Sequence, residues 1–147
     1  MKLVEIIKNL PYEPPFLFVD ELHRVSNTGI KGSYTFNENL EFYKGHFNNN
    51  PVTPGVILTE CCAQIGLVCL GIHLLGDPPK DKVKIALSSS EMEFYLPVYP
   101  NERVLVSSAK EYFRFHKLKC NVKMHNSSGK LVCKGQIAGM FKTQGNE

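Results

Sequence analysis

The sequence predicts a single α+β domain, residues 1–147, in which a curved antiparallel sheet wraps around one long buried helix. Three observations lead to this prediction. The chain has 147 residues, 43% of them hydrophobic, which is enough for one core. Residues 56–75 are apolar nearly all round, as expected of a helix enclosed by other elements. Four consecutive strand-like segments follow this helix and would form the enclosing sheet.

The N-terminal part predicts a short helix followed by a β-hairpin. Apolar residues recur at helical spacing at Leu3, Ile6, Ile7 and Leu10, and the prolines from Pro11 onwards end the pattern. Residues 16–25 and 29–36 are rich in β-branched and aromatic side chains, as strands are. A turn signal at residues 27–29 separates them, so we expect a hairpin.

An irregular loop is predicted to lead into the central helix. Residues 39–54 contain closely spaced Gly, Asn and Pro, which favour turns. Thr53 is expected to cap the helix, and Pro54 to take its first position, because the fixed φ of proline suits that site. The helix would then run from Val56 to about Leu75, and 20 residues at 1.5 Å each span about 30 Å.

The remaining strands are expected at residues 83–95, 102–115, 118–126 and 130–142, with turns at 100–101 and 126–129. An open sheet of this kind leaves edge strands with unpaired backbone groups. Pairing of edge strands between two copies is a common way to protect them. We therefore expect a homodimer, with a trimer of dimers as a further assembly that the sequence leaves open.

Composition and charge exclude several classes of function. A net charge of +3 with scattered Lys and Arg is too mild for a nucleic-acid-binding protein. The basic cluster of Arg114, His116, Lys117 and Lys119 is interpreted as a solvated face, with contact to an acidic carrier protein as the alternative. No secretory h-region is evident, and the apolar stretch 65–75 is shorter than the roughly 20 residues that span a bilayer. The sequence thus predicts a soluble, cytoplasmic protein.

The five cysteines are interpreted as reduced core residues. Their number is odd, they form no C-x-x-C pair, and three of them lie in the predicted central helix. Neither they nor the histidines show the spacing of metal ligands, so no metal is expected. A nucleophilic Cys61 or Cys62 is the alternative interpretation.

Glu60 is the first candidate for chemistry. It and His73 are the only ionisable residues of the central helix, and Gln64 follows Glu60 by one turn on the same face. A carboxylate in apolar surroundings needs either a structural partner or a chemical role. Because perturbed carboxylates concentrate in active sites, the functional interpretation is favoured.

His46 and Gly55 are weaker candidates when each is considered alone. His46 lies in the loop before the helix and could act as a general base, although an isolated loop histidine is more often a surface residue. The backbone N–H groups of Gly55 and Val56 at the helix start could stabilise the enolate that forms when a thioester is deprotonated. The alternative is an ordinary helix start.

The segment GHFNNNPVTPGVILTECCAQ, residues 45–64, resembles the FabZ-type 3-hydroxyacyl-ACP dehydratases. The GHF motif, the short loop, the P-x-x-PGV helix start and the E-x-x-AQ stretch occur in the family's order and spacing. The resemblance extends to LPYEPPFLFVDEL before this segment and FYLPVYPNERV after it, so it covers nearly the whole chain.

The resemblance implies a hotdog fold and dehydration of a 3-hydroxyacyl thioester carried by acyl carrier protein, without a cofactor. His46 of one subunit would remove the C2 proton, and Glu60 of the other would assist the loss of water. Gly55 and Val56 would hold the thioester carbonyl, and Gln64 would orient Glu60. Apolar residues could line an acyl tunnel, although core packing explains each of them equally well: Phe47, Val56, Leu58, Phe94 and Leu96.

Two departures from the family pattern are visible. The family usually has His-Arg where this chain has Tyr12-Glu13, and a basic residue is common at the position of Leu96. Both changes are expected to affect the entrance and carrier recognition more than the chemistry. Two alternatives stay open: a hotdog thioesterase, which needs no histidine in this frame, and a supporting subunit of a heteromeric dehydratase.

Overall fold

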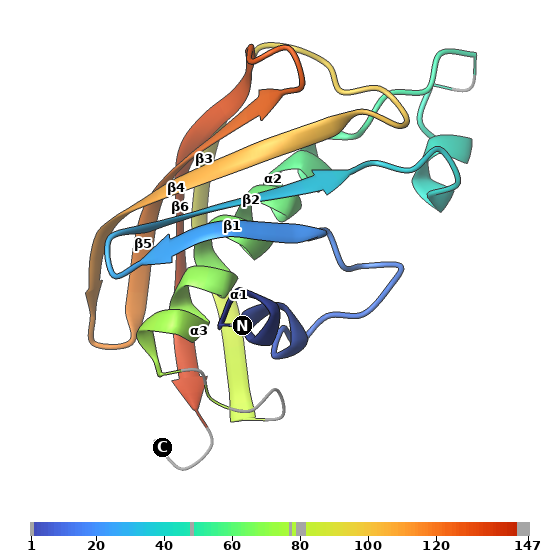
Figure 1. Ribbon diagram of the computed structural model, residues 1–147. Helices are drawn as coiled ribbons and strands as arrows, with labels where there is room; N and C mark the ends of the chain where they lie inside the picture. Colours follow the sequence, from blue (N-terminus) through green and yellow to red (C-terminus); the bar gives the residue numbers. More distant parts are fainter. Residues whose placement is uncertain (1, 48, 77, 79–81, 144–147) are drawn as a thin grey trace.

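The computed structural model describes residues 2–47, 49–76, 78 and 82–143. A curved antiparallel sheet lies around a central helix (Figure 1), which confirms the predicted α+β hotdog fold. The helices are α1 (Lys2–Lys8), α2 (Gly55–Ala63) and α3 (Leu70–Leu74), and the strands are β1 (Glu21–Ser26), β2 (Gly29–Thr35), β3 (Val83–Phe94), β4 (Arg103–Arg114), β5 (Lys117–Asn126) and β6 (Leu131–Thr143).

The strand order in the sheet is β1-β2-β4-β5-β6-β3, with every neighbouring pair antiparallel. The strand β3 precedes β4 in the chain but pairs with β6, so residues 95–102 carry the chain from one side of the sheet to the other. The two edges are therefore β1 and β3. Twelve residues long, β3 is exposed along most of its length.

The central helix is continuous from residue 55 to residue 74, but its middle is wider than an α-helix. Residues Gln64–Cys69 between α2 and α3 form a π-helical segment. Such segments often occur at functional sites. All six of these residues are buried against the concave face of the sheet, where Gly66 allows close approach: a Cβ there would lie only 2.8 Å from Val122 Cγ1.

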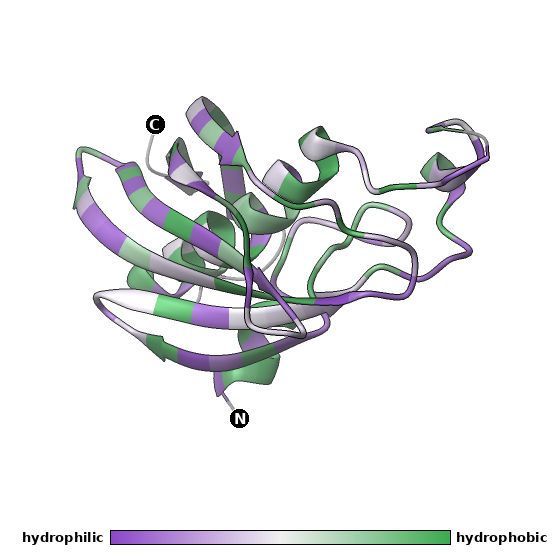
Figure 2. Ribbon diagram, turned by 90° about the horizontal axis from the view of Figure 1, so that it is seen from above, coloured by the Kyte–Doolittle hydropathy of each residue, from purple (hydrophilic) through white to green (hydrophobic). Residues whose placement is uncertain are grey.

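Hydrophilic and hydrophobic residues alternate along the strands (Figure 2), as expected of a sheet with one covered face. The 20-residue helix is longer than the apolar stretch considered above, and by length and composition alone it could cross a membrane. However, 72% of its most apolar window is buried inside the protein. Here the helix forms the core that the sheet encloses.

The N-terminal end of the helix differs from the sequence-based expectation. Pro54 precedes the first helical residue, Gly55, and makes no side-chain cap. The Thr53 side chain does not cap the helix either, because its hydroxyl is hydrogen-bonded to the hydroxyl of Tyr43. The first strand is also shorter than expected: residues 16–20 lie outside β1, and the backbone of Phe16 and Phe18 is hydrogen-bonded to Gln64 instead.

The five cysteines are all free and buried, which confirms their interpretation as reduced core residues. Burial raises the pKa of the Cys61 and Cys69 thiols, which disfavours the thiolate that a nucleophile requires. In Cys62, a hydrogen bond with Cys133 and burial both raise the pKa. The thiol alternative for Cys61 and Cys62 therefore gains no support from their surroundings.

Candidate active site

His46 lies in the loop between a 3₁₀ turn, Glu41–Lys44, and the central helix. The next residue, Phe47, has a positive φ of 60°, a conformation that non-glycine residues rarely adopt and that concentrates at functional sites. The imidazole of His46 lies against the Phe47 ring with 4.3 Å between centroids. The loop thus holds His46 half-buried, with an exposed aromatic side chain beside it.

One hydrogen bond fixes the tautomer of the neutral His46 ring. Nδ1 lies 2.7 Å from the carbonyl oxygen of Val52. Because a carbonyl oxygen can only accept, Nδ1 must carry the hydrogen and donate it. In the neutral imidazole, Nε2 then has a free lone pair and can take up a proton, as a general base must.

His46 and Gly55 line the same cleft, which has a volume of about 410 Å³. Its other lining residues are Phe47, Val52, Thr53, Leu58, Phe94, Tyr95, Leu96 and Pro97. Gly55 is the first residue of α2, where the leading backbone N–H groups have no intrahelical partner and carry partial positive charge. A carbonyl oxygen bound in this cleft could therefore accept from the helix start while its neighbouring carbon faces a base.

Glu60 lies one and a half turns further along α2, in a different cavity of about 50 Å³. The other lining residues are Tyr12, Ala63, Leu67, Val68, Ile85 and Leu87. Burial among these mainly apolar side chains raises the pKa of the Glu60 carboxyl, and a hydrogen bond from Gln64 counteracts this in part. A carboxyl with a raised pKa is suited to donating a proton.

Gln64 holds the Glu60 carboxylate and the N-terminal segment together. Its Nε2 donates to Glu60 Oε2 at 2.9 Å and to the Phe16 carbonyl oxygen at 3.0 Å. Its Oε1 accepts from the Phe18 backbone N–H at 2.8 Å. All of these bonds are made by a side chain with no solvent exposure, at the first residue of the π-helical segment. These hydrogen bonds fix the position of the Gln64 side chain beside Glu60.

Tyr12 is a residue of this site whose position the sequence did not reveal. Its side chain lines the Glu60 cavity. Burial first, and the nearby Glu60 charge second, raise the pKa of Tyr12 to about 12, so the phenol keeps its proton at neutral pH. Of the two departures from the family pattern, Leu96 lines the His46 cleft and Tyr12 the Glu60 cavity. Each departure from the family pattern therefore lies in the wall of one of the two cavities.

Within one chain, the expected site residues fall into two groups. His46, Phe47 and Gly55 line the larger cleft, and Glu60 with its partner Gln64 belongs to the smaller cavity. The side chain of Val56 is 76% exposed and lines neither of them. The edge strand β3 connects the two groups, because Leu87 lines the Glu60 cavity and Phe94 lines the His46 cleft.

Replacement of Glu60 by glutamine is expected to stabilise the folded protein at neutral and alkaline pH. Below the ordinary value of 4.5, the carboxyl is protonated in both the folded and the unfolded state. As the pH rises from 4.5 through the higher folded pKa, the unfolded state loses its proton first and stability falls. Above that pKa the penalty is constant, and Glu60→Gln removes it while keeping an acceptor for Gln64.

Urea denaturation of wild type and Glu60→Gln at about pH 4 and about pH 8 checks this expectation. At the higher pH the free energy of unfolding should rise by about 1 kcal/mol or less, since solvent screens a partly exposed group. At the lower pH the two proteins should agree. A variant that is less stable than wild type at pH 8 would show that ionised Glu60 stabilises the fold.

Comparisons with known proteins show the family to which the chain belongs. Residues 10–138 match the model of the FabA-like domain. The 3-hydroxyacyl-(acyl-carrier-protein) dehydratase FabZ of Ehrlichia canis is 31% identical over 144 residues, covering 94% of this chain and 93% of the relative. The enzyme of the same name from Paramagnetospirillum magneticum is 34% identical, with coverage of 92% and 84%.

Solved structures with low sequence identity share the fold. The dehydratase heterocomplex ApeI:P from Xenorhabdus doucetiae superposes with a TM-score of 0.78 at 11% identity, covering 96% of this chain and 93% of that one. A hypothetical thioesterase with coenzyme A from Streptococcus pneumoniae gives a TM-score of 0.61 at 10% identity, with coverage of 84% and 86%.

Proposed function

Because the chain belongs to the FabA-like domain family, we propose that it dehydrates 3-hydroxyacyl thioesters on acyl carrier protein to trans-2-enoyl thioesters. The pathway would be fatty acid synthesis or a related acyl-chain synthesis in the cytoplasm. The observation that supports the proposal is that the chain carries two groups with complementary chemistry. One is a histidine with a free Nε2 beside a helix N-terminus, and the other is a buried carboxyl with a raised pKa.

In the proposed reaction, His46 Nε2 takes the proton from C2 of the substrate. The electron pair left on C2 forms the C2–C3 double bond as the C3–O bond breaks. The departing hydroxyl receives a proton from Glu60 and leaves as water, so the step is balanced without a cofactor. The backbone N–H groups of Gly55 and Val56 stabilise the negative charge that develops on the thioester oxygen.

The two halves of the proposed site come together through the edge strand β3. The Glu60 cavity borders β3 at Leu87, and the His46 cleft borders it at Phe94. If β3 pairs antiparallel with β3 of a second copy around residues 90–91, Phe94 of one copy lies opposite Leu87 of the other. His46 of one subunit then faces Glu60 of its partner at each end of the paired strands.

The exposed surface of β3 supports this homodimer. Leu87, Phe94 and Tyr95 are large side chains that are about half exposed in the single chain, and Phe47 beside the cleft is 65% exposed. An unpaired edge strand with exposed apolar side chains favours association. A two-fold axis through β3 would cover these side chains and complete two equivalent sites. Further assembly into a trimer of dimers would use other surfaces.

Mass spectrometry of 3-hydroxyacyl-ACP and 3-hydroxyacyl-CoA substrates incubated with the purified chain tests the proposal. We expect a mass loss of about 18 Da, that of one water, with wild type, and almost none with a folded His46→Ala variant. Release of free acid instead would identify a thioesterase. Absence of any reaction with all chain lengths would show that the chain needs a different, catalytic partner subunit.

A further inference from the structure

The outer face of the sheet, opposite the central helix, carries a row of basic side chains. Cross-strand partners share a face, and the register aligns Arg24 of β1, Lys31 of β2, Ser107 of β4, Lys123 of β5 and Lys134 of β6. We call Arg24, Lys31, Lys123 and Lys134 the basic row. The row crosses five strands, and at about 4.8 Å between neighbouring strands the distance from Arg24 to Lys134 is about 19 Å.

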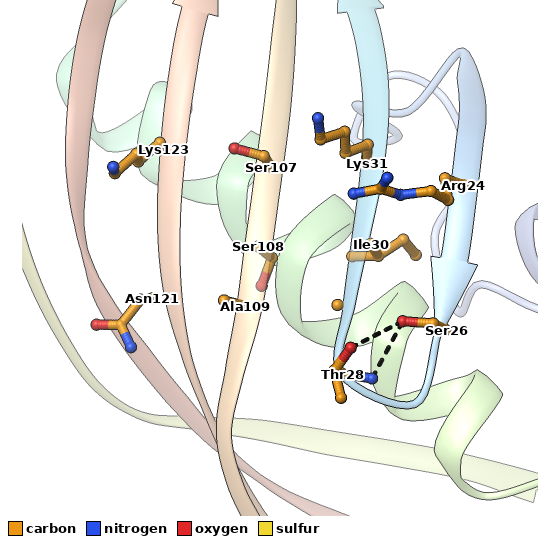
Figure 3. A pocket seen from close by; sticks show the side chains of 11 residues that line it. Arg24, Ser26, Thr28, Ile30, Lys31, Ser107, Ser108, Ala109, Asn121 and Lys123 are labelled. Carbon is orange, nitrogen blue, oxygen red and sulfur yellow. Dashed lines mark hydrogen bonds between the residues drawn. The ribbon is translucent and has the colours of Figure 1, made fainter.

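Three members of the basic row, Arg24, Lys31 and Lys123, line an open hollow of about 760 Å³ on this face. Figure 3 shows the Arg24, Lys31 and Lys123 side chains extending from their strands around the hollow. The side chain of Ser108, by contrast, points to the helix, where its hydroxyl donates to the Gly66 carbonyl. The hollow shares no lining residue with either candidate cavity of the active site, so it is a separate feature of the sheet.

The side chains of the basic row lack close partners among the described residues. None of its four side chains forms an ion pair or hydrogen bond with any residue that the structure describes. By contrast, two residues of the cluster at the end of β4 and β5 have partners within the chain: Lys119 pairs with Glu111, and Arg114 lies over the Tyr112 ring. The acidic residue that continues the basic row is Glu93 on β3, opposite Lys134.

The register also places like charges directly opposite one another. Arg24 faces Lys31, and Lys123 faces Lys134. Like charges in such positions destabilise a sheet. Glu93 is the one acidic partner in this register, at the β3 end, so a face that carries two such pairs is arranged for an anionic partner that supplies further counter-charges.

From these observations we infer that the basic row docks an acidic segment of a partner protein, a helix or strand that presents carboxylates in a line. A second copy of this chain does not fit, because stacking the same face on itself would bring cations together. A nucleic acid fits poorly, since no residue lining the hollow is aromatic and bases have nothing to stack on. A small anion would need converging donors, whereas these cations are spread along a line.

Fluorescence anisotropy with labelled poly-L-glutamate of about 20 residues tests this inference. The double variant Lys31→Glu/Lys123→Glu should bind at least about tenfold more weakly than wild type. The control Lys8→Glu/Lys130→Glu changes the net charge equally, at exposed positions away from the basic row, and should bind within about threefold of wild type. Equal losses in both variants would overturn the inference, as would wild type that fails to bind.

Two further measurements complete the test. The reversals place carboxylates opposite Arg24 and Lys134, so the unfolding midpoint of the double variant should not fall, and loss of binding cannot then reflect misfolding. A labelled single-stranded oligothymidylate of about 20 nucleotides should bind more weakly than poly-L-glutamate. Equal or tighter binding of the oligonucleotide would overturn the assignment to an acidic protein segment.

Discussion

Coexpression of the His46→Ala and Glu60→Gln variants is expected to restore dehydration that neither variant shows alone. Each single variant should lose about 100- to 10,000-fold in turnover, because each lacks one of the two proton-transferring groups. In a mixed dimer, one of the two sites combines the intact His46 of one subunit with the intact Glu60 of the other. Random assembly makes half of the dimers mixed, so about a quarter of wild-type activity should return.

This result follows only if the site is divided between subunits. The control is coexpression of His46→Ala with the double variant His46→Ala/Glu60→Gln, in which no site has an intact histidine and no activity should return. If the first mixture also stays inactive although size-exclusion chromatography shows folded dimers, the division of the site along β3 is wrong. Substrate and assay are those of the mass-spectrometric test above.

Replacement of Gln64 by leucine is expected to have the second largest effect, on both stability and turnover. Leucine has a similar volume but leaves the buried Phe18 N–H and the Phe16 carbonyl without their partner. Each unsatisfied group costs about 1 to 3 kcal/mol, so the free energy of unfolding should fall by about 2 to 5 kcal/mol. The Glu60 carboxylate also loses its hydrogen bond and its fixed position, which should lower turnover about 100-fold.

The pH dependence of the Gln64→Leu variant separates the effect of lost stability on turnover from the effect of the lost hydrogen bond to Glu60. Because the Gln64 hydrogen bond lowers the pKa of Glu60, its removal should move the limb of the pH–rate profile that reports Glu60 to higher pH. Ile137→Ala is the matched control, since it truncates a fully buried β6 side chain and costs a similar 2 to 5 kcal/mol or so without touching Glu60. An equal loss of turnover in both variants would mean that Gln64 acts only through stability.

The local elements of the fold could be predicted because they depend on nearby residues. Strand-forming composition and turn residues located the hairpin and the last four strands, and a long stretch that is apolar nearly all round located the central helix. The order of the strands could not be predicted in this way. Nothing in the β3 segment indicates that it pairs with β6 rather than with β4, because that choice is made by contacts about 50 residues apart.

In the candidate site, too, some features could be predicted from the sequence and others could not. His46, Glu60 and Gly55 stand out by residue type and by the motif that contains them, and Gln64 by its helical spacing from Glu60. The two hydrogen bonds between Gln64 and the backbone of Phe16 and Phe18, and the position of Tyr12 beside Glu60, arise from the path of the N-terminal segment. That path is irregular, and irregular backbone has no periodic pattern by which sequence could locate it.

The late pairing of β3 has a consequence for synthesis of the chain. Its only partner strand in the sheet, β6, lies about 50 residues later, so at about 5 to 20 residues per second β3 waits for roughly 2.5 to 10 seconds after it is made. During that interval a long strand with two free edges is prone to associate with other nascent chains. Its run of Ser88, Ser89, Ser90 and Glu91, followed by Glu93, places hydroxyls and negative charges there. We therefore expect these residues to protect the chain from aggregation before the fold itself can do so.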